Sequence, residues 1–420
     1  MENTVTQVTL KNGLKVMLKE IHTAPIISSW LWYRVGSRDE STGKTGVSHW
    51  TEHMQFKGTK KFPANMLDKA ISRDGGRWNA ATSRDSTHYY ETMPADKIDL
   101  VLQFESDRMK NSLFDAKEVA SERTVIMSER EGHENEPLFR LVEAVQQVAF
   151  RVHPYHHEVV GDMDDLRTIT RDDLYDHYRR YYIPNNAVLA LAGDFKTSSM
   201  LKRIKELFGP IPKGAIPPRL ARSEPEQKGE VRFSVEGPGD TTYIQLAYRL
   251  PNATHPDYFP LQVFDSLLGG ANGLSGKTSR LYRALVDKEY AVDVSGWAEP
   301  TIDPYLYRIT LVTHPKRKAE EVIAALDAEI KKLQDGLASE AEITRAVKQA
   351  RAVFVYGNEN ISNQAFWLGY VEMFSSYEWY INYLDSLAKV TSQDVQRVAQ
   401  KYFQSSSRVV GTYIPKGDGA

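Results

Sequence analysis

The sequence predicts an α+β fold of two homologous repeats, each a mostly antiparallel sheet with helices packed on one face. Two observations support this prediction. Segments 166–188 and 387–409 share a helix start, a helix end and a following strand at a constant offset. The matching residues are Leu166 and Leu387, Thr170 and Thr391, Asp173 and Asp394, Tyr181 and Tyr402, and Val188 and Val409. Residues 209–229 contain five prolines and form the clearest linker. The predicted domains are therefore 1–208, the linker 209–229, and a second repeat over 230–420.

The composition is that of an ordinary folded chain without a charge bias. At 420 residues the chain is too long for one core. It carries 53 basic and 55 acidic side chains with no block of either sign, which argues against nucleic acid as a partner. No apolar run approaches the ~18–20 residues that span a bilayer, so no membrane partner is expected.

Cysteine is absent from the chain. Disulfides and thiolate ligands are therefore excluded, and a metal site would have to use His, Asp or Glu. The N-terminal stretch 1–11 lacks the apolar centre of a signal peptide. The location stays open between the cytoplasm and an exported compartment such as a periplasm, and export would require a leader that has been removed.

The first elements are strands. Residues 5–10 and 14–18 flank a Lys-Asn-Gly turn that is typical of a hairpin. Residues 26–35 form an apolar and aromatic run suited to a central strand. A helix over 64–73 ends at a Gly-Gly pair. The alternating stretch 77–92 is predicted to be a strand with one edge free.

Helices dominate the following segments. Apolar spacing predicts helices over 98–111, 117–131, 138–152 and 170–182, and a short buried strand over 187–193. In the second repeat, residues 261–268 stand near the position where the first repeat has its histidine helix, but they lack the histidine motif. One repeat is therefore expected to carry chemistry and the other not.

The motif that carries chemistry lies within residues 46–59. Read as a helix, it places His49 and His53 one turn apart on one face, with Glu52 beside them. Two imidazoles can hold one metal ion, and a carboxylate can manage the protons of a water that the metal activates. The order His-x-x-Glu-His is the signature of inverzincins. The alternative is a chance pair of helix histidines, so the motif needs its structural context.

Two glutamates on the predicted helix 117–131 compete for the role of third ligand. Glu122 and Glu129 lie seven residues apart, on one face of the helix. Acidic residues on a helix are most often solvated surface. A site with two histidines and no cysteine still lacks a ligand, and we assign that place to Glu129.

These residues resemble the pitrilysin family of zinc peptidases, in particular the branch of mitochondrial processing peptidases and their bacterial relatives. The resemblance covers nearly the whole chain, through segments 46–59, 75–90, 122–129, 185–195 and 279–285. In that family the third zinc ligand is a glutamate about 76 residues beyond the second histidine. In this chain that position is Glu129.

The resemblance implies a role for each matching residue. His49, His53 and Glu129 would bind one Zn²⁺ per chain, and Glu52 would be the general base. Glu122 would support the site as a further carboxylate, with a surface glutamate as the alternative. Asn79 and Ala80 would hold the backbone of a peptide that adds as a strand beside residues 77–82. The implied activity is zinc-dependent endopeptidase hydrolysis in an enclosed chamber.

One departure from the family concerns the partner. Many members carry an Arg and a Tyr, seven residues apart, after the segment that matches 279–285. Here those positions are Val286 and Asp293, while Arg283 and Tyr290 have the right spacing three residues out of register. The resemblance then implies a heterodimer in which a homologous subunit supplies the Arg/Tyr pair. A homodimer using Arg283 and Tyr290 is the alternative.

Three other interpretations compete. Residues 271–278 fit a loose Walker A pattern, but they follow a predicted helix where a P-loop needs a strand. A glycine-rich loop that helps recognise substrate is favoured there. His153, His156 and His157 could suggest another metal site, but next to Pro154 they are interpreted as packing or surface histidines. A non-catalytic assembly subunit of the same fold is the rival from another class. Such relatives typically lose zinc residues, whereas His49, Glu52, His53 and Glu129 are present.

Overall fold

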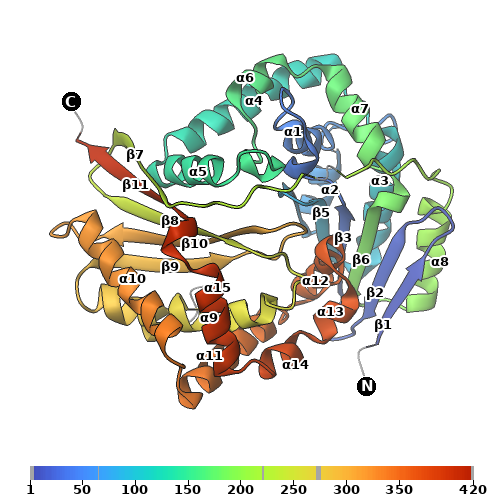
Figure 1. The fold of residues 1–420 in the computed structure, drawn as a ribbon. Helices are drawn as coiled ribbons and strands as arrows, with labels where there is room; N and C mark the ends of the chain where they lie inside the picture. The colour runs from blue at the N-terminus through green and yellow to red at the C-terminus, as the bar shows by residue number, and fades with distance from the viewer. Residues whose placement is uncertain (1–3, 65, 220–221, 271–275, 418–420) are drawn as a thin grey trace. The chain divides into compact units, whose positions relative to one another are not determined.

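The computed structural model describes residues 4–64, 66–219, 222–270 and 276–417, and the chain divides into two compact units. The first unit comprises Met1–Glu131, His157–Arg222 and Asn358–Tyr377. The second comprises Gly132–His156, Ser223–Gly357 and Glu378–Ala420. Each unit has its own sheet and its own helices (Figure 1). Among the helices of the described residues, none has the length and apolar character needed to cross a membrane.

The sheet of the first unit has six strands in the order β1-β2-β6-β3-β5-β4. β2 and β6 are parallel, and the other neighbours are antiparallel. The strands are β1 (Val5–Thr9), β2 (Lys15–Glu20), β3 (Ile26–Tyr33), β4 (Arg77–Thr82), β5 (Thr87–Pro94) and β6 (Ala187–Gly193). The hairpin expected around 11–13 joins β1 and β2 and is confirmed. β6 is buried along its whole length because it lies between β2 and β3.

The single strand predicted over 77–92 is wrong in one respect, because the stretch forms the hairpin β4–β5. The chain turns at residues 83–86, where the backbone N–H of Ser83 donates to the carbonyl of Ser86 (2.8 Å). Turn residues with hydroxyl side chains interrupt the alternation there without Gly or Pro to mark the break. β4 is the last strand in the sheet order, so the predicted free edge is confirmed.

Helices cover one face of this sheet and enclose the main core of the first unit. The core runs from the interior face of the strands to buried side chains of the helices. The helices are α1 (Val47–Met54), α2 (Met66–Arg73), α3 (Ile98–Asn111), α4 (Ala116–Glu134), α6 (Met163–Thr168), α7 (Arg171–Tyr181) and α8 (Thr197–Phe208). The expected helices 64–73, 98–111, 117–131 and 170–182 are confirmed, with ends shifted by a few residues.

The opposite face of the first sheet is covered by α12 (Ile361–Phe374), which lies against β3 and β6 (Figure 1). Trp30 and Trp32 of β3 point to this face and form a second core with Ala365 and Leu368 of α12. Lys15 of β2 forms an ion pair with Glu372 of the helix (2.7 Å). A helix from the last quarter of the sequence thus completes the first unit.

The sheet of the second unit has five strands in the order β7-β11-β8-β10-β9. β7 and β11 are parallel, and the remaining neighbours are antiparallel. The strands are β7 (Val231–Pro238), β8 (Tyr243–Leu250), β9 (Ala291–Ala298), β10 (Tyr305–Thr313) and β11 (Arg408–Lys416). The helices are α5 (Pro137–Ala149), α9 (Tyr258–Leu268), α10 (Ala319–Asp335), α11 (Glu340–Tyr356), α13 (Tyr377–Ile381), α14 (Tyr383–Ala388) and α15 (Ser392–Tyr402).

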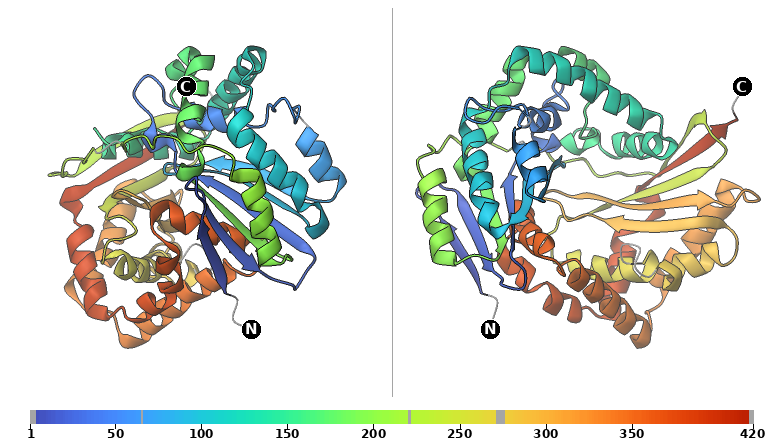
Figure 2. Two further views of the ribbon diagram at one scale, coloured as in Figure 1. Left: turned by 90° about the vertical axis from the view of Figure 1, so that its right-hand side faces the viewer. Right: turned by 180° about the vertical axis from the view of Figure 1, so that it is seen from behind.

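This second sheet also has helices on both faces (Figure 2). α9, α10, α11 and α15 enclose a core on one face. α5, the helix expected over 138–152, packs on the other face through Leu141 and Val145.

The two sheets share one topology, which confirms the α+β fold of two repeats. The expectation of helices on one face only is wrong, because α12 and α5 cover the second face of each sheet. β2-β6-β3-β5-β4 of the first unit corresponds in order and direction to β7-β11-β8-β10-β9 of the second. The corresponding helices α7 and α15 begin with the same capping box, at Thr170 and Thr391. Each compact unit also contains one helix, α12 or α5, from the other half of the sequence. The division of the repeats at 209–229 stays a prediction.

Candidate metal centre

Helix α1 is held at its N-terminus by a buried carboxylate. Gly46 precedes the helix with φ +85°, and a Cβ there would lie 2.4 Å from the carbonyl oxygen of Val160. The carboxylate of Glu40 accepts hydrogen bonds from the backbone N–H groups of Gly46 and Ser48, both at 2.8 Å. A negative charge at a helix start also interacts favourably with the helix dipole. These contacts fix the direction in which α1 presents its side chains.

His157 supports the same helix start. Its Nε2 lies 2.9 Å from Oε2 of Glu40, and the imidazole is buried. Of the histidines predicted to be packing or surface residues, His157 is therefore a packing one. His153 belongs to the second unit, where its Nε2 lies 3.2 Å from the Asp303 carboxylate.

The two motif histidines lie on one face of α1. Their ring centroids are 4.6 Å apart, and Trp50 and Met54 on another face are fully buried in the core. Nε2 of His49 lies 3.7 Å from Oε1 of Glu129, and Nε2 of His53 lies 3.7 Å from Oε2 of the same carboxylate. α4 therefore brings Glu129 to both histidines, as predicted.

The donor set fits a zinc ion. Among the described residues, His49, His53 and Glu129 form the group of His, Asp and Glu side chains whose ligand atoms all lie within 4.8 Å of one another. Tetrahedral zinc with bonds of ~2.0–2.1 Å places its ligand atoms ~3.4 Å apart. The two histidine–Glu129 separations of 3.7 Å need to close by only a few tenths of an ångström.

Glu122 touches the back of the second histidine. Nδ1 of His53 donates to Oε1 of Glu122 at 2.8 Å, and the Glu122 side chain is 7% exposed. A proton on Nδ1 leaves the lone pair on Nε2, on the side of Glu129. Burial acts to raise the pKa of Glu122, but the hydrogen bonds from His53 and Lys57 outweigh it, so the pKa is lowered. Burial acts to lower the pKa of His53, but the Glu122 hydrogen bond and nearby carboxylates raise it.

Glu52 lies beside the histidines and is buried. The hydroxyl of Thr82, at the end of β4, donates to Oε2 of Glu52 at 2.7 Å. Burial raises the pKa of Glu52, and the Thr82 hydrogen bond offsets only part of this effect. A raised pKa suits a group that takes up and returns a proton. Sequence analysis did not single out Thr82, because the contact joins residues 30 apart in the chain.

Asn79 and Ala80 lie on the free-edge strand β4. Ala80 is opposite Tyr89 of β5, and its backbone N–H donates to the side-chain oxygen of Asn79 (2.9 Å). Trp78 on the same strand stacks edge to face with Phe56, just beyond α1. The same edge strand therefore carries Asn79, Ala80 and the residue that contacts Glu52.

The residues discussed for a partner lie in the second unit. Val286 ends a π-helical turn and packs on the core that α9, α10, α11 and α15 enclose in the second unit, and Asp293 is exposed on β9. Arg283 is exposed, whereas the ring of Tyr290 lies 4.4 Å below the Arg317 guanidinium. Residues 271–275 of the Walker-like stretch lie outside the described residues, and helix α9 precedes them as predicted.

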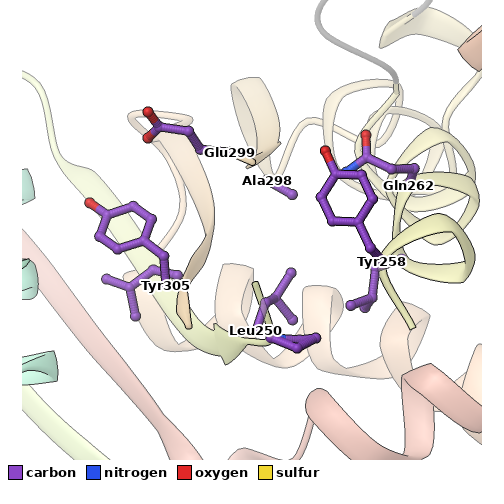
Figure 3. A pocket seen from close by; sticks show the side chains of 9 residues that line it. Leu250, Tyr258, Gln262, Ala298, Glu299 and Tyr305 are labelled. Carbon is purple, nitrogen blue, oxygen red and sulfur yellow. The ribbon is translucent and has the colours of Figure 1, made fainter. Parts of the chain in front are cut away.

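A small pocket in the second unit does not compete with this site (Figure 3). It lies between α9 and the ends of β8, β9 and β10, with Tyr258, Glu299 and Tyr305 among its lining residues. Its cavity volume is about 10 Å³, which is room for one water molecule. A peptide or cofactor does not fit in it.

Comparison with known proteins gives consistent results. Residues 15–163 match the family model described as insulinase (peptidase family M16), and residues 168–350 match the model described as peptidase M16 inactive domain. The zinc protease PqqE of Helicobacter pylori is 30% identical over 406 residues, covering 95% of this chain and 90% of the relative. A probable mitochondrial-processing peptidase subunit beta of Arabidopsis thaliana is 26% identical over 420 residues, covering 98% and 78%. The crystal structure of a protease from Helicobacter pylori superposes with a TM-score of 0.92 at 28% identity, covering 98% of this chain and 100% of that one.

The fold and the side-chain cluster together define the class of protein. It is a two-repeat α+β protein with a candidate site for one metal ion on a His-x-x-Glu-His helix. The extent and coverage of the matches then identify the family. The chain belongs to peptidase family M16. The resemblance to the pitrilysin family and its processing-peptidase-like branch is thereby confirmed.

Proposed function

We propose that the chain is a zinc-dependent metalloendopeptidase that hydrolyses peptides or unfolded segments. The observation that carries the proposal is the convergence of His49, His53 and Glu129 within 4.8 Å, with Glu52 on the same helix as the histidines. The relatives that are zinc proteases by name, such as PqqE of Helicobacter pylori, support the choice of zinc.

The chemistry divides between the metal and the protein. When bound to these three residues, zinc supplies Lewis acidity toward a water molecule and a peptide carbonyl. Glu52 takes a proton from the attacking water and returns it to the leaving nitrogen. The Thr82 hydroxyl donates to Oε2 of Glu52 and so orients this carboxylate. Glu122 holds His53 in the tautomer that can bind a metal.

The substrate backbone adds as a strand beside β4. The outer edge of β4 has no neighbour in the sheet order, and Thr82 at its end contacts the general base. On binding, the Asn79 side chain would release the N–H of Ala80 to a peptide carbonyl. Backbone hydrogen bonds supply affinity with little demand on sequence.

A homologous partner subunit completes the site. Val286 and Asp293 stand at the positions where many family members carry Arg and Tyr. The similarity to a probable mitochondrial-processing peptidase subunit beta supports a hetero-oligomer. A homodimer that uses Arg283 and Tyr290 is the alternative. Mass spectrometry of the intact native assembly distinguishes them: a second, homologous chain supports the first, and two identical chains support the second.

The rival function is a non-catalytic assembly subunit. The words "inactive domain" describe the model that matches residues 168–350. The four residues proposed for zinc binding and proton transfer lie within 15–163, outside that match. This placement favours the enzyme.

Metal analysis and one variant test the proposal. The purified assembly should contain about one zinc per copy of this chain and should cleave casein, an unfolded protein. Glu52→Gln should retain zinc and lose activity by about 10²–10⁴-fold, because a positioned general base contributes about that much. Glu131→Gln, on an exposed part of α4, is the matched control and should keep full activity. An assembly without zinc, or one whose cleavage survives Glu52→Gln, would refute the proposal and favour the assembly subunit.

A further inference from the structure

Lys57 lies just beyond α1 and contacts the carboxylate that holds His53. Its Nζ forms an ion pair with Oε2 of Glu122 and lies 3.8 Å from Oε2 of Glu118. Glu122 uses its other oxygen for Nδ1 of His53. The three side chains therefore form a chain of contacts from Lys57 through Glu122 to His53.

We propose that Lys57 is a positioning residue for the metal centre, acting on zinc affinity through Glu122. The inference rests on the zinc site of the proposed function. Lys57 pairs with Glu122 and lies near Glu118, and neither glutamate is a proposed ligand, so its effect on the metal site passes through the Glu122 carboxylate. Its role is to keep Glu122 turned toward His53.

The backbone on both sides of Lys57 is constrained, which limits where its ammonium group can lie. The N–H of Lys57 donates to the carbonyl of Met54 (3.1 Å), which ties it to the last turn of α1. Gly58 follows with φ +90°, and a Cβ there would lie 2.6 Å from the backbone nitrogen of Ala64. The chain is thus forced into a tight turn directly after Lys57. This turn keeps the backbone of Lys57 at the end of the helix that carries both histidines.

Glu122 needs this contact because it is buried. A buried carboxylate must have its oxygens paired, since an unpaired buried charge is costly. With Lys57 present, one oxygen accepts from the ammonium group and the other from His53. Without Lys57, the carboxylate would gain by rotating toward solvent, and His53 would lose the acceptor that holds its ring and its Nδ1 proton.

The direction in which zinc affinity changes when Lys57 is removed distinguishes a positioning role from a purely electrostatic one. A lysine near a divalent cation repels it, so removing its charge should tighten zinc binding if charge alone mattered. If Lys57 orients Glu122, removing it should weaken binding. Partners of metal-binding histidines typically change metal affinity by about 10–100-fold when mutated. We expect Glu122→Gln to fall in that range and Lys57→Met to weaken binding by about 3–10-fold.

The test is a zinc titration of the full chain against a chromogenic chelator, without any activity measurement. Lys57→Met should bind more weakly than wild type, and Lys57→Arg should restore most of the affinity. Glu118→Gln, which removes the more distant carboxylate near Lys57, is the matched control and should change affinity less than about twofold. In the Glu122→Gln background, Lys57→Met should have no further effect, because the path through Glu122 is already broken.

Nuclear magnetic resonance of chain with ¹⁵N-labelled histidine gives a second readout that needs no zinc. In wild type the Nδ1 proton of His53 should give an NMR signal, because it is protected from exchange with solvent. In Lys57→Met this signal should disappear. Equal or tighter zinc binding by Lys57→Met, or an additive loss in the double variant, would overturn the inference alone. A wild-type chain that binds no zinc would overturn both this inference and the proposed function.

Discussion

The packing of α12 on the sheet of the first unit can be tested at Gly369. This glycine lies in the middle of α12, and a Cβ there would be 2.2 Å from Cδ1 and 2.3 Å from Nε1 of Trp32. Trp32 is 1% exposed and stacks on Trp30 in the core under α12, so it has no room to move aside. Gly369→Ala must therefore push α12 away from the sheet.

Two opposing effects set the magnitude of this change. Alanine in a helix interior is favoured over glycine by about 1 kcal/mol. Overpacking a close-packed core costs about 1–3 kcal/mol, and a 2.2 Å approach to a rigid indole belongs at the upper end. The net loss of about 2 kcal/mol should lower the Tm of a unit of this size by about 4–8 °C.

Gly132→Ala is the matched control. Gly132 is also helical, near the end of α4, and nothing lies within 4 Å of a Cβ built there. Alanine should stabilise that helix by about 0.5–1 kcal/mol. Scanning calorimetry of both variants measures the two shifts, which should have opposite signs. A Gly369→Ala protein as stable as wild type would mean that α12 does not pack on Trp32 in this way.

Two further outcomes concern the ligand set and a buried acid. Glu129→Gln should reduce bound zinc well below one per chain and abolish casein cleavage. An unchanged zinc content in this variant would exclude Glu129 as a ligand. Removal of zinc by a chelator should inactivate the wild type until zinc is restored. In the second unit, burial raises the pKa of Asp265 to about 7, and the hydrogen bond from Tyr307 only partly opposes this. The folded state then keeps a proton that the unfolded state releases, so stability should fall as pH rises from about 4 to about 7, relative to Asp265→Asn. Tm values of both proteins across this range would show it, and parallel curves would contradict it.

Much of the site was predictable because its first part is local. The spacing of His49, Glu52 and His53 follows from the helix period, which places them together whatever the rest of the chain does. The assignment of Glu129 as the third ligand depended on the absence of cysteine and on the resemblance to a known family. Thr82, Lys57 and Glu40 escaped sequence analysis, because polar residues near a turn or strand end carry no periodic signal that names their partner.

The sequence by itself determined the two α+β repeats, most helices and strands, the free edge at β4 and the helix that carries the two histidines. Apolar periodicity and the internal repeat express these features within short stretches of chain. Only the tertiary structure decided that 77–92 is a hairpin, that α5 and α12 each complete the unit of the opposite half, and that Lys57 reaches Glu122. Trp30 and Trp32 show in the sequence that the second face of the sheet is apolar, but not which helix covers it. That choice depends on the fit of surfaces more than 300 residues apart, exemplified by Gly369 against Trp32.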